Sequence, residues 1–174
     1  MTKGNPLGTP AVKNMEQPKR KHPRLKEYDY SQPGYYYVTI HTANSDTVLS
    51  TVGRGLAPAV TPSFCGNIAE QELLALEKRY DYLVIDKYVI MPTHIHAILV
   101  LKAGASPRPT LTDIIGAYKS ITTRRCNQEL DTPGQKRFQT SFYESVLRNT
   151  SAYQECWRYI DENPLKWSLC PEDR

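Results

Sequence analysis

The chain lacks a long apolar run, and this absence excludes one class of protein at the outset. No apolar stretch among the 174 residues approaches the roughly 18 residues that a membrane-spanning helix needs. The N-terminal segment has basic residues and prolines but lacks the hydrophobic segment of a secretory signal peptide. We therefore expect a cytoplasmic protein without a membrane anchor, long enough to bury the hydrophobic core of one domain.

Cysteine is scarce and has no informative spacing. The four cysteines, Cys65, Cys126, Cys156 and Cys170, form no CxxC pair and no pattern typical of a zinc site. We expect ordinary reduced thiols, which again favours the cytoplasm.

Acidic residues are nearly absent from the first part of the chain. Residues 1–26 hold seven lysines and arginines against a single acid, although the net charge of the whole chain is only +4. Residues 1–25 also have few large apolar side chains, so we expect a flexible basic N-terminal arm followed by a single domain at 26–174. Such an arm can tether a polyanion, most often nucleic acid; a solvated leader segment is the alternative.

Hydrophobic periodicity predicts an α+β fold. The expected strands and helices alternate in the order β, α, β, β, α, β, α. Strands are expected at 35–43, 82–90, 94–101 and 138–149, and helices at 67–79, 110–129 and 150–163. Short antiparallel strands with two interspersed helices indicate a ferredoxin-like, RRM-like antiparallel sheet with helices on one face. The C-terminal helix is then free to cross the other face.

Local signals place the ends of these elements. Asn67 is the expected cap of the first helix, and Thr110 with Asp113 opens the second. The third helix is expected to stop before Pro164. The segment 44–65, rich in glycine and proline, is predicted to be a loop with room for one short strand at 46–52.

Two histidines interrupt the apolar strand "VIMPTHIHAILVL", residues 89–101. On a strand, side chains two residues apart point to the same face and lie roughly 6 to 7 Å apart, so His94 and His96 converge. Two imidazoles at that separation can ligate one divalent cation and leave positions open for substrate oxygens. A pair of core histidines is the alternative.

The last predicted helix carries the candidate partners of the histidines. In "CWRYIDENP", Tyr159 and Asn163 are four residues apart and share a helix face, with Glu162 beside them. A helix docked across the sheet would bring a phenol and an amide oxygen to the imidazoles. The same residues also fit the apolar stripe of an ordinary amphipathic helix.

Several motifs in fixed order resemble one known family. "MPTHIHAILVL" is similar to the His-hydrophobe-His (HUH) motif of single-tyrosine transposases, and "RYIDENPLKW" is similar to their nucleophile helix. "KHPRLKEYDYS", "YVIMPTHIH", "FYESVLRN" and "YIDENPLKW" together resemble the REP-associated tyrosine transposases over about residues 21–167.

The resemblance implies an activity and a set of site residues. It implies cleavage and joining of single-stranded DNA near hairpin repeats through a covalent 5′-phosphotyrosine. Tyr159 is the implied nucleophile, His94 and His96 are the implied ligands of Mg²⁺ or Mn²⁺, and Asn163 completes the metal site. Single-stranded or hairpin DNA is the implied partner, the location is the cytoplasm in association with the nucleoid, and both a monomer and a homodimer stay open.

Basic side chains of the chain are predicted to hold DNA phosphates without reading sequence. The predicted DNA-binding residues are Lys19, Arg20, Lys21, Arg24, Lys119, Arg124, Arg125 and Arg148. Among the tyrosines, Tyr28, Tyr30 and those at 35–37 are candidates for stacking on unpaired bases.

Four positions depart from the family pattern. One is Thr93, where the family commonly has asparagine and which lies outside the implied ligand set. The family has tryptophan, arginine and histidine where this chain has Phe138, Thr140 and Ser145. These changes leave open a second function, a catalytically weakened DNA-binding module on the same fold. A hydrolytic metallophosphoesterase is a third reading, disfavoured because the chain lacks the additional Asp and His clusters of two-metal hydrolases.

Overall fold

The computed structural model describes residues 28–44, 47–55, 57–104 and 107–169. The predicted basic arm, with Lys19, Arg20, Lys21 and Arg24, lies outside these residues. Three of the four cysteines fall within them and are free thiols. In the described part of the chain, no helix combines the length and apolarity that crossing a membrane requires.

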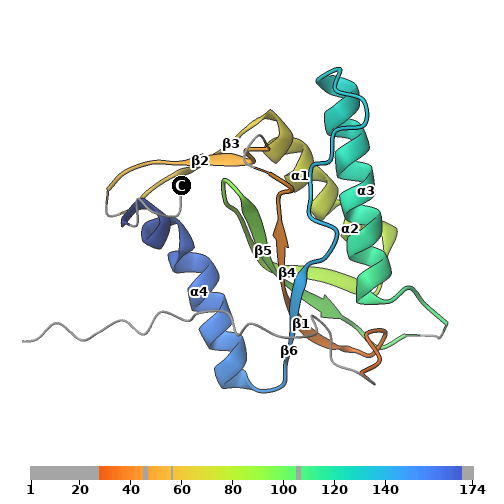
Figure 1. Ribbon diagram of the computed structural model, residues 1–174. Helices are drawn as coiled ribbons and strands as arrows, with labels where there is room; N and C mark the ends of the chain where they lie inside the picture. Colours follow the sequence, from red (N-terminus) through yellow and green to blue (C-terminus); the bar gives the residue numbers. More distant parts are fainter. Residues whose placement is uncertain (1–27, 45–46, 56, 105–106, 170–174) are drawn as a thin grey trace, which may run out of the picture.

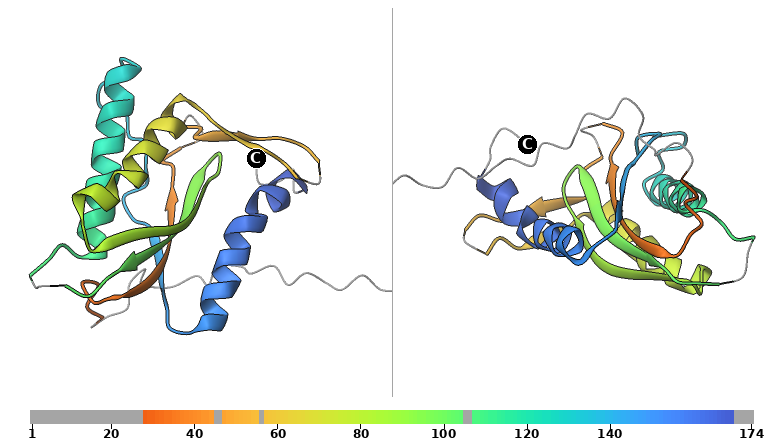
Figure 2. Two further views of the ribbon diagram at one scale, coloured as in Figure 1. Left: turned by 180° about the vertical axis from the view of Figure 1, so that it is seen from behind. Right: turned by 90° about the horizontal axis from the view of Figure 1, so that it is seen from below.

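Four antiparallel strands form the central sheet. They are β1 (Gly34–His41), β4 (Leu83–Ile90), β5 (His94–Leu101) and β6 (Tyr143–Leu147), in the order β4-β5-β1-β6. This order places the first and third strands at the centre, as in a ferredoxin-like sheet. The helices α1 (Phe64–Leu74), α2 (Leu76–Arg79) and α3 (Leu111–Glu129) cover one face, and α4 (Thr150–Leu169) crosses the other (Figures 1 and 2). The predicted fold class is confirmed.

Strand alternation builds a core on each face of the sheet. Ile40, Ile95 and Leu99 are fully buried against α1 and α3 in the larger core. Tyr37 and Ile98 point the other way and pack with α4 in a smaller core. Because neighbouring residues of a strand face opposite sides, the same β1 and β5 supply both layers.

The first helix begins earlier than predicted. Ser63, not Asn67, is the cap, since its hydroxyl accepts a hydrogen bond of 3.0 Å from the Gly66 amide. Asn67 lies inside the helix and donates back to the Ser63 carbonyl. A side chain at Gly66 is excluded because a Cβ there would lie 1.8 Å from the carbonyl oxygen of Leu49. This close approach, a tertiary contact, sets where α1 begins.

The segment predicted as a loop contains a two-stranded hairpin. Strands β2 (Ser50–Val52) and β3 (Val60–Pro62) pair antiparallel, so the region holds two short strands where the sequence indicated room for one. Strand β2 also contacts α4. Strand β3 contacts α1, so the hairpin touches helices of both layers.

Two predicted ends at the C-terminal side were wrong. The last helix runs through Pro164 to Leu169, although proline leaves the carbonyl of Ile160 without its usual amide donor. The extra turn has a tertiary partner, because the Trp167 ring packs 5.9 Å from the His94 ring. The strand predicted at 138–149 shortens to β6, preceded by one isolated bridge.

A buried carboxylate joins α1 to its neighbours and gives a first prediction. Glu72 is 5% exposed, accepts a hydrogen bond of 2.6 Å from Arg125 and forms an ion pair with Arg79. Burial raises the pKa of Glu72, but the two guanidinium groups outweigh it, and the net pKa lies below the usual value. The ion pairs therefore stabilise the fold above the unfolded-state pKa and are lost as the pH falls through the folded-state pKa.

We expect Glu72→Gln to lower the free energy of unfolding at pH 7 by about 1–3 kcal/mol, because charge-assisted hydrogen bonds are lost. The same change should make the free energy of unfolding depend less on pH below 4.5, the ordinary pKa of a glutamate carboxyl group. Urea unfolding at neutral and acidic pH measures both effects. If the variant loses stability at acidic pH as steeply as the wild type does, another carboxylate controls the acid dependence.

Candidate active site

The histidine pair of β5 faces α4. His94 and His96 lie on one face of the strand, and their ring centroids are 4.5 Å apart. On the neighbouring strand β1, the residues in register with them are His41 and Thr39. The two imidazoles therefore converge, as strand geometry predicts.

His96 has one satisfied and one unsatisfied ring nitrogen. Its side chain is almost fully buried at 2% exposure. Nδ1 lies 2.7 Å from the hydroxyl oxygen of Tyr37 and 3.0 Å from that of Thr39. Nε2 is buried without a hydrogen-bond partner among the described residues. A proton on Nε2 would be a buried unsatisfied donor, which is costly, so the proton belongs on Nδ1 and the Nε2 lone pair stays free.

His94 is held by polar and aromatic neighbours. Its Nδ1 lies 3.2 Å from the Thr93 hydroxyl, and Asn163 of α4 is hydrogen-bonded to the ring. Burial lowers the pKa of His94 to about 4, the charge of His41 adds to this, and the Asn163 hydrogen bond opposes it. Burial also lowers the pKa of His96, with His94 and His41 contributing. Both rings are therefore neutral at pH 7, the form that binds metals.

Helix α4 brings the predicted nucleophile to this pair. The Tyr159 ring lies 5.2 Å from the His96 ring, edge to face, and Asn163 is buried at 6% exposure one turn further on. The i, i+4 spacing puts both on the helix face that meets the sheet. Tyr159 and the histidines belong to the same chain.

Polar contacts seat α4 on the sheet edge. Lys87 of β4 forms an ion pair of 2.7 Å with Asp161 and lies 3.8 Å above the Trp157 ring. The Tyr153 hydroxyl donates to Asp86 at 2.8 Å. The Lys166 ammonium lies 5.0 Å from the centre of the Tyr159 ring. The side of α4 that faces the sheet therefore carries both the apolar residues of an amphipathic helix and the residues of the candidate site. Both interpretations of this helix in the sequence analysis apply.

A third histidine escaped the sequence analysis. His41 lies 5.5 Å from His94, ring to ring, on the adjacent strand. Its position could have been read from the alternation of β1, where Tyr35, Tyr37, Thr39 and His41 share a face. What the sequence did not reveal is the β1–β5 register that sets it opposite His94.

The donors present fit a divalent cation. They are the free Nε2 of His96, the neutral ring of His94 and the side-chain amide of Asn163. In the described ranges, no group of three or more His, Cys, Asp and Glu side chains is arranged to hold a metal ion. The third donor would accordingly be an amide, and the set is two imidazoles and one amide oxygen.

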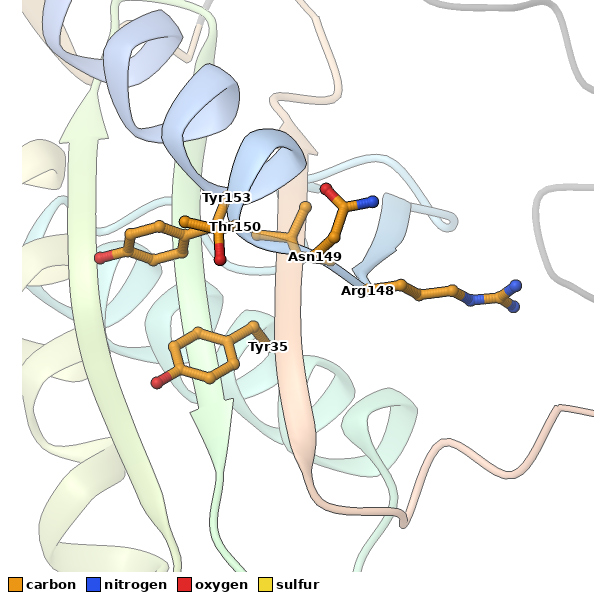
Figure 3. A pocket seen from close by; sticks show the side chains of 6 residues that line it. Tyr35, Arg148, Asn149, Thr150 and Tyr153 are labelled. Carbon is orange, nitrogen blue, oxygen red and sulfur yellow. The ribbon is translucent and has the colours of Figure 1, made fainter.

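The predicted DNA-binding cations that the structure describes are spread over both faces. Lys119 and Arg125 lie on α3, behind the sheet, where Lys119 donates to the carbonyls of Gln139 and Thr140 and Arg125 pairs with Glu72. Arg124 is exposed on the same helix. Arg148 is exposed at the start of α4, beside a surface pocket on the histidine face (Figure 3). Of these four, Arg148 alone lies on the side of the site.

The positions that depart from the family pattern lie in different surroundings. Phe138 is buried against Tyr118, and Thr140 is exposed and accepts a hydrogen bond from Lys136. Ser145 of β6 is in register with Tyr37 and so shares the face of the site. Of these three departures, only Ser145 borders the His96 network. The fourth departure, Thr93, has its hydroxyl 3.2 Å from Nδ1 of His94.

Comparison with known proteins supports the fold. No family model matches the chain. An uncharacterized protein of Haemophilus influenzae is 27% identical over 168 residues, covering 85% of this chain and 89% of that protein. The solved structure of a REP-associated tyrosine transposase bound to a REP hairpin superposes with a TM-score of 0.63 at 20% identity, covering 84% of this chain and 75% of that one. The two chains share their fold.

Proposed function

We propose that this chain is a metal-dependent endonuclease and strand transferase for single-stranded DNA, of the REP-associated tyrosine transposase family. The observation that carries the proposal is the contact of Tyr159 with His96 while Asn163 contacts His94, all in one chain. The motif order of the sequence and the fold shared with a hairpin-bound transposase support it.

The proposed reaction is a transesterification. The Tyr159 oxygen attacks the scissile phosphorus, its proton leaves, and the bond to the 3′ oxygen breaks as that oxygen takes up a proton. The products are a 5′-phosphotyrosine and a free 3′-hydroxyl, which can attack in reverse and join another strand. One phosphodiester replaces another, so no nucleotide triphosphate is consumed.

The chain's residues prepare this step. His94, His96 and Asn163 would hold Mg²⁺ or Mn²⁺, which when bound acts as a Lewis acid on the phosphate oxygens. Packing of the Tyr159 ring on His96 and Tyr37 orients the phenol and limits its rotation. A phenol also leaves more readily than an alkoxide, which suits a reversible transfer.

The test uses hairpin-bearing single strands with randomised flanks, incubated with the protein and Mn²⁺. We expect a protein–DNA adduct that survives denaturing electrophoresis. A label at the 3′ end should move with the protein, and a label at the 5′ end should appear on a free fragment ending in a 3′-hydroxyl. Cleavage without an adduct would instead indicate attack by water and reject the transesterase.

A weakened DNA-binding module is the second candidate, favoured by Ser145. The family histidine expected at this position would share a sheet face with Tyr37 and the His96 network, and serine supplies no imidazole there. This candidate predicts binding of the same oligonucleotides with no cleavage. Restoration of cleavage by Ser145→His would identify the missing group.

Tyr37 gives a prediction about the metal site. Its hydroxyl lies 2.7 Å from Nδ1 of His96. In the tautomer that the unpartnered Nε2 favours, the hydroxyl accepts the Nδ1 proton and keeps the Nε2 lone pair available. We expect Tyr37→Phe to weaken Mn²⁺ binding by about 10–100-fold. Titration followed by electron paramagnetic resonance measures the affinity, and nitrogen chemical shifts of His96 in metal-free protein report the tautomer.

Tyr88→Phe is the matched control for Tyr37→Phe. It removes one hydroxyl from the opposite face of the same sheet, where that group donates to Glu70. We expect it to leave Mn²⁺ affinity and the His96 tautomer unchanged. Equal affinities in the two variants would show that Tyr37 does not control His96.

A further inference from the structure

We propose that the surface pocket at the start of α4 binds one unpaired nucleotide of the DNA strand. This inference rests on the proposed function and adds a substrate-binding subsite to it. The pocket has a volume of about 420 Å³ and is lined by Tyr35, Leu147, Arg148, Asn149, Thr150 and Tyr153. It opens where β1, β6 and the first turn of α4 meet, on the histidine face of the sheet (Figure 3).

One side of the pocket is an aromatic platform. Tyr35 is 45% exposed, whereas Tyr36 and Tyr37 beside it on β1 are buried. Its ring packs edge to face on Tyr153 at 5.5 Å, a geometry that leaves ring surface uncovered. Tyr153 itself is anchored through its hydroxyl to Asp86. Such a braced, exposed ring is the surface on which proteins stack single-stranded bases.

The other side of the pocket carries an uncommitted cation. Arg148 is exposed and forms no hydrogen bond or ion pair with any residue that the structure describes. Arg108, Arg125 and Arg137 are by contrast all bonded within the fold. In Figure 3 the Arg148 side chain extends away from the two tyrosines, so a base on the rings and a phosphate at the guanidinium need not compete. The carboxylate of Asp86 accepts a hydrogen bond from the Tyr153 hydroxyl.

The pocket lies within reach of the candidate nucleophile. Tyr153 and Tyr159 are six residues apart on α4, a rise of about 9 Å. Tyr35 and Tyr37 are two residues apart on one face of β1, about 7 Å. A single strand with one base in the pocket can therefore place a nearby phosphate at Tyr159. Because the platform needs an unpaired base, it would select single strands over duplex and tolerate any base.

The test measures binding of fluorescent oligothymidine to the full chain by anisotropy at several salt concentrations. Tyr35→Ala should weaken binding about tenfold, as stacking on one base is lost. Tyr35→Phe keeps the ring and should bind like the wild type. Arg148→Gln should weaken binding and reduce the salt slope by about 0.7, the contribution of one phosphate contact. Lys78→Gln, which removes an exposed charge on α2, is the charge control.

Photo-crosslinking keeps the proposal falsifiable if Tyr35→Ala impairs folding. Bromouracil in the strand should crosslink to Tyr35 or Tyr153, as located by mass spectrometry. Crosslinks confined to other surfaces, or wild-type affinity in folded Tyr35→Ala, would overturn the subsite and leave the transferase proposal standing. A wild-type chain that binds no single-stranded DNA would overturn both.

Discussion

Replacing Tyr159 with phenylalanine should abolish the covalent protein–DNA adduct and reduce strand cleavage by about 10³-fold or more, because the attacking oxygen is removed. The ring keeps its contacts with His96 and Tyr37, and its hydroxyl forms no hydrogen bond with any residue that the structure describes. Stability should therefore change little. Denaturing electrophoresis of labelled DNA measures the adduct, and thermal unfolding checks the fold.

Tyr143→Phe is the matched control for this change. Tyr143 is the tyrosine of β6 and lies on the same face of the sheet, with its ring 6.4 Å from that of Tyr37. The control variant should form the adduct normally. An adduct that persists in Tyr159→Phe and disappears in Tyr143→Phe would show that Tyr143 is the nucleophile. Cleavage that continues in Tyr159→Phe without any adduct would favour a hydrolytic enzyme.

Replacing His96 with glutamine should remove Mn²⁺ binding and, with it, adduct formation. The side chain is buried, and its Nε2 has no hydrogen-bond partner among the residues that the structure describes. Loss of a direct ligand should cost more than the 10–100-fold expected for its hydrogen-bonding partners. Calorimetric titration with Mn²⁺ measures the affinity independently of catalysis.

The variant His41→Gln tests whether His41 is a ligand of the metal ion or only a neighbour of the site. His41 contacts His94 but is not one of the proposed donors. It should retain most of the Mn²⁺ affinity, whereas His96→Gln should not. If folded His96→Gln binds Mn²⁺ as the wild type does, the proposed metal site is wrong. If His41→Gln loses binding to the same extent, the ligand set includes a residue of β1.

Features that depend on local sequence were predicted well. The alternation of β5 placed His94 and His96 on one face, and the i, i+4 spacing placed Tyr159 and Asn163 together. Helix α3 begins as expected because its capping box closes within four residues, between Thr110 and Asp113. Each of these rests on geometry that a few consecutive residues determine.

Features that depend on distant contacts were missed or misplaced. The start of α1 follows from the approach of Gly66 to Leu49, and the turn beyond Pro164 packs against His94. The predicted DNA-binding residue Arg125 is bonded to Glu72, 53 residues away, a partner that the sequence did not indicate. A basic residue on a helix has the same local pattern in both roles, so the sequence could not distinguish them.

The sequence alone determined which side chains share a face, because the period of a strand or helix is a property of consecutive residues. It therefore identified two separate pairs. One is the two imidazoles on a strand, and the other is the phenol and the amide on a helix. Only the tertiary structure decided how the pairs meet: the β1–β5 register brings Tyr37, Thr39 and His41 to the histidines, and the docking of α4 brings Tyr159. Register and docking minimise the free energy of the whole core, so no single stretch of the chain encodes them.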